Sequence, residues 1–127
     1  MVRTLTLPVA LFIFVRFASA ADAVAGKAYF TQVCTQCHTA ERTDGGGETG
    51  PTLFELFGRP AAVGDEGFPY SQALKDSKLV WDAATLERFL ADPMTAVPGT
   101  TMPMPIAVKT DRDNVVAYFK SLLNGAK

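Results

Sequence analysis

Apolar residues recur at helical spacing in three segments of the chain. Gly26 and Phe30 lie four positions apart within residues 23–33, so they share one face of a helix. Residues 83–91 carry an i, i+3, i+4 stripe made of Leu86, Phe89 and Leu90. A third helix, predicted over residues 111–123, has an apolar face formed by Val115, Tyr118, Phe119 and Leu122. A glycine inside a helix costs about 1 kcal/mol relative to alanine, so Gly26 either allows another helix to approach closely or is a tolerated exposed residue.

Residues that begin and end helices support these boundaries. Asp22, Ser71 and Asp82 can cap helices over residues 23–33, 72–75 and 83–91, because their side chains accept hydrogen bonds from free N–H groups. Residues 110–113 resemble a capping box before the last helix. We expect Pro93 to stop helix 83–91 and Gly125 to end the last helix.

The segments between these helices are irregular. Residues 39–50 are polar and contain three consecutive glycines, which predicts a loop. Residues 97–106 contain three prolines and two methionines, Met102 and Met104, which predicts an extended and stiffened loop. Four large apolar side chains within residues 53–57 are expected to pack against the core or a cofactor. No segment alternates as a strand would, so the predicted fold is all-α, with short helices around a cofactor.

The first twenty residues are typical of a signal peptide. A short basic start is followed by an apolar run over residues 5–15 and by the small residues Ala18, Ser19 and Ala20, which predicts cleavage before Ala21. The run is shorter than the roughly 20 apolar residues that span a bilayer, so a permanent membrane anchor is the weaker alternative. We therefore divide the chain into a signal peptide, residues 1–20, and one mature domain, residues 21–127.

Charge limits the partners of the mature domain. Cleavage would remove two of the 12 basic residues and none of the 13 acidic residues, which changes the net charge from −1 to −3. An acidic domain of this kind is not expected to bind nucleic acid.

The clearest chemical motif is Cys34-Thr35-Gln36-Cys37-His38. It matches C-x-x-C-H, in which two thiols can add to the two vinyl groups of one porphyrin and the histidine becomes an axial ligand of the iron. The chain contains two cysteines and one histidine, all of them in this motif. The motif predicts one covalently attached haem c per chain. Export agrees with this prediction, because haem is attached outside the cytoplasm.

Three other interpretations of the motif are weaker. A thioredoxin-like redox pair requires a βαβ pattern, whereas the flanking segments are predicted to be helical. A structural zinc site needs four ligands, and this chain offers two cysteines and one histidine. A disulfide between Cys34 and Cys37 would close too short a loop to add much stability.

Taken together, these motifs resemble those of a small soluble monohaem cytochrome c of the mitochondrial and bacterial type. The resemblance runs from Gly26 to Leu123. It rests on the C-x-x-C-H motif, on Gly50-Pro51, Leu56-Phe57-Gly58-Arg59 and Pro98-Gly99-Thr100-x-Met102, and on single residues that include Phe30, Phe68, Tyr70, Trp81 and Tyr118. It implies that the first and last helices cross, with Gly26 and Phe30 packed against Tyr118.

The resemblance also implies a role for each site residue. Cys34 and Cys37 would form the thioether bonds, and His38 and Met102 would be the two axial ligands of the iron. The carbonyl of Pro51 would accept a hydrogen bond from the His38 ring, while Arg59, Tyr70, Trp81 and Thr100 would bind the haem propionates or their surroundings. The register of Pro-Gly-Thr-x-Met favours Met102 over Met104 and Met94. The chain departs from the family at Thr101, Met104, Phe89 and Leu74, where the family more often carries a lysine, an aromatic residue, a tyrosine and a polar residue.

The function implied is single-electron transfer between respiratory or photosynthetic redox partners, without enzymatic activity. We expect a monomeric periplasmic protein, not permanently inserted in a membrane, that meets a membrane oxidoreductase complex, an oxidase, a reaction centre or a dehydrogenase. Two alternatives remain open. One is a peroxidase-like or gas-binding haem protein with a labile methionine ligand, and the other is an electron-transfer subunit of a dehydrogenase.

Overall fold

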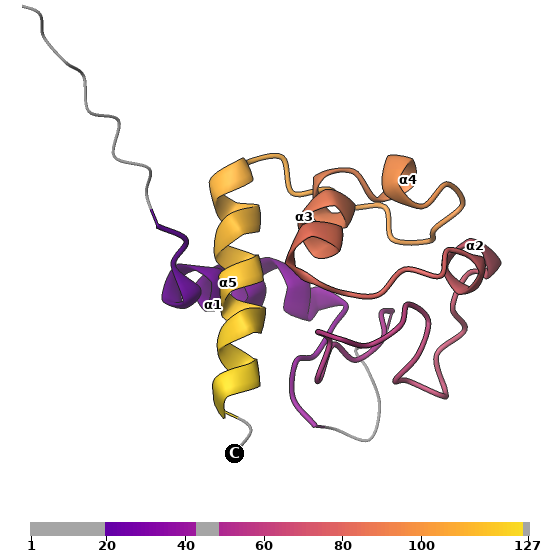
Figure 1. Ribbon diagram of the computed structural model, residues 1–127, viewed down its shortest axis with the longest axis horizontal. Coiled ribbons are helices and arrows are strands. Elements are labelled where there is room, and N and C mark those ends of the chain that lie inside the picture. Colours follow the sequence, from indigo (N-terminus) through magenta and orange to yellow (C-terminus); the bar gives the residue numbers. More distant parts are fainter. Residues whose placement is uncertain (1–19, 43–48, 126–127) are drawn as a thin grey trace, which may run out of the picture.

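A computed structural model describes residues 20–42 and 49–125, and in these residues the fold is helical (Figure 1). The elements are α1 (Ala23–Val33), the short 3₁₀ helix η1 (Cys34–Gln36), α2 (Gln72–Asp76), α3 (Ala83–Ala91), α4 (Pro93–Ala96) and α5 (Lys109–Gly125). Within these ranges no strand forms, and β pairing is limited to one antiparallel bridge between Pro60 and Val80. The predicted all-α fold is confirmed.

Three predicted caps are present. The Asp22 carboxylate accepts hydrogen bonds from the backbone N–H groups of Val24 and Ala25 at 2.8 and 3.2 Å. Ser71 Oγ accepts one from the N–H of Leu74 at 3.2 Å. Asp82 and Thr85 form a reciprocal capping box at the start of α3. Each cap satisfies donors that the first helical turn leaves free, so the short helices begin where the sequence predicts.

Two boundaries differ from the prediction. Helix α5 begins at Lys109, two residues before the predicted start. After α3 ends, Pro93 opens the separate four-residue helix α4, which Asp92 caps through the Thr95 N–H at 3.1 Å. Proline suits the first turn of a helix, where its missing N–H would have had no partner. Pro93 thus stops one helix and starts another.

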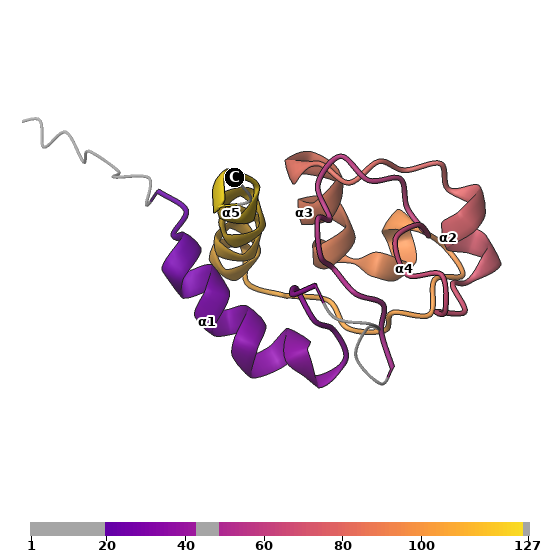
Figure 2. The ribbon, with the colours of Figure 1, turned by 90° about the horizontal axis from the view of Figure 1, so that it is seen from below.

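Helices α1 and α5 cross, as the resemblance implied (Figures 1 and 2). At the crossing, a Cβ on Gly26 would overlap the backbone carbonyl of Asn114 and lie 3.0 Å from the Cβ of Tyr118. Phe30 contacts Tyr118 and Phe119, with ring centroids 5.6 and 5.5 Å apart. Gly26 is therefore buried because α5 passes directly over it, and of its two interpretations the close approach of another helix is confirmed.

The predicted apolar face of α5 was wrong at Leu122. Val115, Tyr118 and Phe119 are buried as expected, and Val116 is buried as well. Leu122, however, is 36% exposed. Helix α5 rises about 1.5 Å per residue, so Leu122 lies about one turn beyond Tyr118 and has already passed the crossing with α1.

The core lies between the crossed helices and α3. Leu86, Phe89 and Leu90 of α3 are buried as predicted, and the Trp81 ring packs edge-on against Phe89 with centroids 5.1 Å apart. The remaining buried hydrophobic residues are Phe30, Leu56, Ala61, Val97, Ile106, Val115, Val116, Tyr118 and Phe119. Of the apolar run at residues 53–57, Leu56 is buried and Leu53 and Phe57 pack against this core, as expected.

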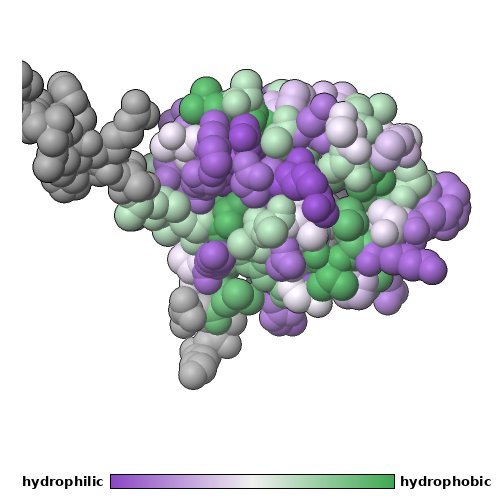
Figure 3. All heavy atoms as spheres, turned by 45° about the horizontal axis from the view of Figure 1, so that its top comes forward, coloured by the Kyte–Doolittle hydropathy of each residue, from purple (hydrophilic) through white to green (hydrophobic). Residues whose placement is uncertain are grey.

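The surface mixes polar and apolar side chains. On the face drawn in Figure 3, hydrophobic and hydrophilic residues are interspersed. Exposed large hydrophobic residues include Val24, Val63, Met94, Met104 and Val108. Among the described helices, none has both the length and the apolar character needed to cross a membrane. The predicted signal peptide, residues 1–20, lies outside the described residues except for Ala20.

Candidate haem-binding site

A cavity of about 440 Å³ opens between α1, α3, α5 and the long loops. This volume is within the range of about 300–1,000 Å³ typical of small-molecule and cofactor sites. Most of its wall is apolar, with contributions from Phe30, Leu56, Leu86, Phe89 and Phe119. Every site residue named from the sequence lines this cavity, namely Cys34, Cys37, His38, Pro51, Arg59, Tyr70, Trp81, Thr100 and Met102.

The end of α1 forms one side of the cavity. After α1 the chain tightens into the 3₁₀ helix, where the N–H groups of Cys37 and His38 both donate to the carbonyl of Cys34, at 3.1 and 2.9 Å. Cys34 and Cys37 are three positions apart and His38 follows directly, and the turn brings all three to the same cavity. Both cysteines are free thiols and half-buried.

The surroundings of the thiols argue against a redox pair. Burial, together with the neighbouring Cys37, raises the pKa of the Cys34 thiol to about 11. Reactive C-x-x-C pairs have a lowered thiol pKa instead, because the thiolate is the attacking species. Nor do the described residues gather three or more His, Cys, Asp or Glu side chains as a metal site would. The thioredoxin-like and zinc interpretations therefore find no support in the structure.

The ring of His38 is held in a fixed orientation. Its Nδ1 lies 2.8 Å from the carbonyl oxygen of Pro51. A carbonyl can only accept, so Nδ1 carries the proton and donates, and Nε2 keeps its lone pair. A Cβ on Gly50 would lie 2.6 Å from Cε1 and 2.8 Å from Nδ1 of the same ring, so only glycine allows the chain to pass this close.

Burial also controls the charge of His38. It lowers the pKa of the imidazole, and the hydrogen bond to Pro51 partly opposes this shift. The neutral form, which is the form that binds a metal ion, is thereby favoured at neutral pH. The ring thus offers Nε2 as a free nitrogen ligand.

The proline-rich loop brings methionine sulfur to the cavity. Thr100 is buried, Met102 is half-buried and packs against the core, and both line the cavity. Met104 also reaches the cavity rim, but it is 54% exposed. Met94 is exposed and is not among the lining residues. Of the three methionines considered, Met102 is the one whose side chain packs against the core.

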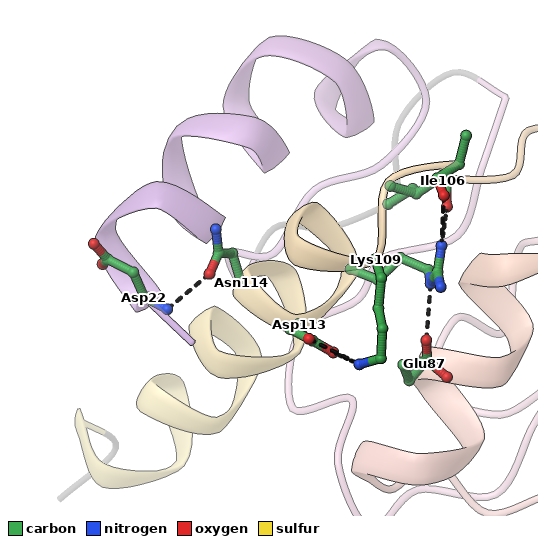
Figure 4. Close-up of polar contacts among 8 residues, drawn as sticks. Asp22, Glu87, Ile106, Lys109, Asp113 and Asn114 are labelled. Carbon is green, nitrogen blue, oxygen red and sulfur yellow. Dashed lines mark hydrogen bonds and ion pairs between the residues drawn. The ribbon is translucent and has the colours of Figure 1, made fainter. Parts of the chain in front are cut away.

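The far end of this loop is attached to two helices. The N–H of Ile106 donates to the carbonyl of Leu90 in α3 at 2.7 Å. The guanidinium of Arg112 in α5 donates to the carbonyls of Ile106 and Ala107 at 2.7 and 2.9 Å, and to Glu87 Oε1 in α3 at 2.8 Å (Figure 4). The loop that carries Met102 is therefore anchored to both α3 and α5.

Arg59 lies between η1 and α2 in the sequence and lines the same cavity. Its Nη1 and Nη2 donate to the carbonyls of Phe54 and Thr52 at 2.7 and 3.0 Å. Its Nε is buried and has no hydrogen-bond partner among the described residues. Burial lowers the pKa of the guanidinium, while Tyr70 and the acidic residues Asp65 and Glu55 oppose the shift. A buried donor without a partner costs about 1–3 kcal/mol, so its position on the cavity wall suits a ligand with an acceptor oxygen.

Three further polar or amphipathic residues line the same cavity as Arg59. The backbone N–H of Trp81 donates to the backbone carbonyl of Arg59 at 3.0 Å, and both side chains line the cavity. The Tyr70 hydroxyl lies 3.4 Å from the carbonyl of Val63, and burial raises its pKa. Thr100 is buried on the methionine loop. Arg59, Tyr70, Trp81 and Thr100 thus share the cavity that the cysteines and His38 enter.

Sequence reasoning missed three residues that hold this site, namely Thr52, Asp65 and Arg112. Thr52 is buried and bridges Arg59 and Asp65, because its carbonyl accepts from Arg59 and its N–H donates to Asp65 Oδ2 at 3.0 Å. Arg112 holds the methionine loop. These contacts join a side chain to the backbone of a distant loop, and such contacts leave no periodic signal in the sequence. The only hint was that Thr52 directly follows Gly50-Pro51.

The cavity therefore fits a haem in three respects. Its wall is apolar enough for a flat macrocycle, two free thiols reach it for covalent attachment, and a histidine nitrogen and a methionine sulfur reach it as possible iron ligands. The buried Nε of Arg59 suits a carboxylate substituent.

Comparisons with known proteins agree with this fit. The family model described as cytochrome c matches residues 23–123. The chain is 38% identical over 102 residues to cytochrome c of Euglena viridis, covering 80% of this chain and 97% of that protein. It is also 38% identical to cytochrome c-type cyt cy of Rhodobacter capsulatus, covering 80% of this chain and 49% of that protein. The structure of cytochrome cH from Methylobacterium extorquens superimposes with a TM-score of 0.70 and 41% identity, covering 80% and 99% of the two chains.

Proposed function

The chain belongs to the cytochrome c family, and we propose that it is an exported electron carrier whose haem iron is bound by His38 and Met102. Members of this family carry a covalently bound haem c and shuttle electrons between redox partners, and they are carriers and not enzymes. The haem supplies iron that takes up and releases one electron. The chain supplies attachment, ligands and an apolar enclosure.

Cys34, Cys37 and His38 would hold one face of the cofactor. The support is that the 3₁₀ helix places all three on the cavity wall. The hydrogen bond from His38 Nδ1 to Pro51 fixes the ring and leaves the lone pair of Nε2 available, so that Nε2 would be the atom that binds the iron. The observation that carries the proposal is this fixed histidine facing a cavity that Met102 also lines.

Met102 would bind the opposite face of the iron. It is enclosed against the core, while Met104 is 54% exposed, and its loop is anchored at Ile106 by Leu90 and Arg112. With His38 and Met102 both bound, the iron would offer no open position to a substrate. A thioether ligand raises the reduction potential, and an unchanged ligand set keeps reorganisation small during electron transfer.

Arg59, Tyr70, Trp81 and Thr100 would bind the propionates or their surroundings. The buried Nε of Arg59 supports this role, since it is a donor available to a carboxylate. Arg59 is already oriented by two backbone carbonyls, so it can bind an anion without further ordering. These residues would also keep water from the enclosed edge of the cofactor.

The location follows from the N-terminal segment. We propose that residues 1–20 direct export and are removed, leaving a periplasmic, monomeric domain of residues 21–127 that is not anchored in a membrane. The proposed partners are a membrane oxidoreductase complex, an oxidase, a reaction centre or a dehydrogenase. The basic start, apolar run and Ala-Ser-Ala end support export.

Replacement of the two methionines tests the ligand assignment. Met102→Ala should abolish the sulfur-to-iron charge-transfer band of the oxidised holoprotein, and the reduced variant should bind carbon monoxide. Met104→Ala is the matched control, because it removes a methionine side chain from an exposed position two residues further along the same loop. This variant should keep the band. The reverse pattern would assign the ligand to Met104. Carbon monoxide binding by the unaltered reduced protein would favour a labile ligand and the gas-binding alternative.

A further inference from the structure

One peptide group in the site is hydrogen-bonded at both ends. The peptide between Pro51 and Thr52 accepts from His38 Nδ1 through its carbonyl at 2.8 Å. The N–H of the same peptide donates to the Asp65 carboxylate at 3.0 Å. The two bonds form a continuous path from the carboxylate, through one amide, to the imidazole.

We propose that Asp65 is a positioning residue that strengthens the hydrogen bond from His38 to Pro51 through this peptide and thereby lowers the reduction potential of the bound haem. The proposal deepens the function proposed above, since it rests on His38 being an iron ligand. Asp65 is half-buried and is not among the residues that line the cavity, so it acts through the peptide rather than by touching the cofactor.

The physical reason is that hydrogen bonds in a chain polarise one another. A negative carboxylate that accepts from an amide N–H draws electron density toward the carbonyl oxygen of that amide, which becomes a better acceptor. A better acceptor draws the Nδ1 proton of His38 more strongly, so Nε2 becomes a more basic ligand. A more basic ligand stabilises the oxidised iron relative to the reduced iron.

The local structure keeps this peptide in place. Arg59 Nη2 donates to the carbonyl of Thr52 at 3.0 Å, and the N–H of Leu53 donates to the carbonyl of Thr39 at 2.7 Å. Thr52 itself is buried, so bulk water does not compete for its N–H. Its Oγ1 accepts from the N–H of Phe54 at 3.2 Å. The segment that joins Asp65 to His38 is thus rigid and shielded, which is the setting in which such coupling is strong.

Asp65→Asn is the decisive variant. It removes the charge but retains an oxygen that can accept from Thr52, so the fold should be kept. We expect the equilibrium constant for reduction of the holoprotein to rise roughly three- to tenfold, where tenfold corresponds to about 59 mV for one electron. Glu66→Gln is the matched control, because it removes the same charge at the next, exposed position.

Removing the negative charge of Asp65 could also raise the reduction potential directly through space, so a second measurement is needed. In Asp65→Asn, the proton resonances of the His38 ring N–H and the Thr52 amide should both move upfield, and the ring N–H should exchange faster with solvent. Glu66→Gln should leave both signals in place. A potential that rises equally in the two variants, or His38 and Thr52 signals that do not move in Asp65→Asn, would overturn the proposal.

The experiment separates this inference from the proposed function. Covalent haem with a histidine ligand is checked first, from the visible spectrum and the hyperfine-shifted His38 resonances of the unaltered protein, and their absence would refute the proposed function instead. If Asp65→Asn yields no folded holoprotein, the Thr52 amide of the unaltered protein still tests the proposed hydrogen bond to Asp65. A slowly exchanging, downfield Thr52 amide supports the bond to Asp65, and a rapidly exchanging amide refutes it.

Discussion

Arg112 connects the loop that carries Met102 to two helices, and its replacement should reveal how much of the fold depends on that connection. Its side chain is only 12% exposed, and it makes three hydrogen bonds, to Glu87 and to the carbonyls of Ile106 and Ala107. Arg112→Met removes all three donors and keeps an unbranched apolar stem. The two carbonyls, one of them on the buried Ile106, then lose their partner.

The expected loss can be worked out from these contacts. Hydrogen bonds from a charged donor contribute about 1.5 kcal/mol each at the low end, and two of them go to backbone carbonyls. The ion pair with Glu87 adds roughly 0.5 kcal/mol, since the Glu87 side chain is 31% exposed and solvent screens the pair. Arg112→Met should therefore lower the free energy of unfolding by about 3.5 kcal/mol. For a domain of this size that corresponds to a fall of roughly 15 °C in Tm.

Denaturant unfolding of the holoprotein, followed by circular dichroism and by the absorption of the iron, measures this loss. Two controls separate its parts. Glu87→Gln keeps an acceptor for Arg112 and should cost less than about 1 kcal/mol. Lys109→Met removes an exposed pair with Asp113 on the same helix and should cost roughly 0.5 kcal/mol or less. If Arg112→Met costs no more than Lys109→Met, the loop does not depend on this side chain and the reasoning is refuted.

Two further predictions concern the helix crossing and the N-terminal segment. Gly26→Val should prevent α1 and α5 from meeting, because even a Cβ would overlap the carbonyl of Asn114. We expect thermal unfolding to show that the free energy of unfolding falls by several kcal/mol, or that no folded protein forms. Ala25→Val, on the same helix, is the control. The intact mass of the haem-bearing protein recovered from the periplasm should correspond to a chain that starts at Ala21, and a chain that retains residues 1–20 would contradict cleavage.

Helices α1, α2 and α3 were predictable because each has local signals, whereas α4 and the start of α5 were not. Asp22, Ser71 and Asp82 cap their helices as predicted, and the i, i+3, i+4 stripe of α3 is buried. Where prediction was wrong, tertiary geometry decided the outcome. Leu122 continues the apolar face of α5 in sequence, but it lies about two turns beyond Asn114, where α1 makes its closest approach, and its side chain is 36% exposed. Pattern alone cannot show where one helix stops covering another.

The site residues were also predictable in part, for a different reason. Cys34, Cys37 and His38 form a compact motif, and the resemblance to cytochrome c pointed to Met102; the structure places all four residues on one cavity. The residues that hold these groups in place carry no such mark. Asp65 is one acidic residue in a polar turn, and Arg112 is one basic residue near the start of a helix. The role of each comes from a hydrogen bond to a backbone group at least five residues away.

These supports divide the site into two separately held halves. On the histidine side, Asp65, Thr52 and Arg59 fix the peptide that orients His38. On the methionine side, Arg112 and Leu90 fix Ile106 at the end of the loop. The two sets have no residue and no hydrogen bond in common, and effects at such sites usually add. We therefore expect Asp65→Asn to change the reduction potential without loosening the methionine loop, and Arg112→Met to loosen the loop without breaking the hydrogen bond of His38.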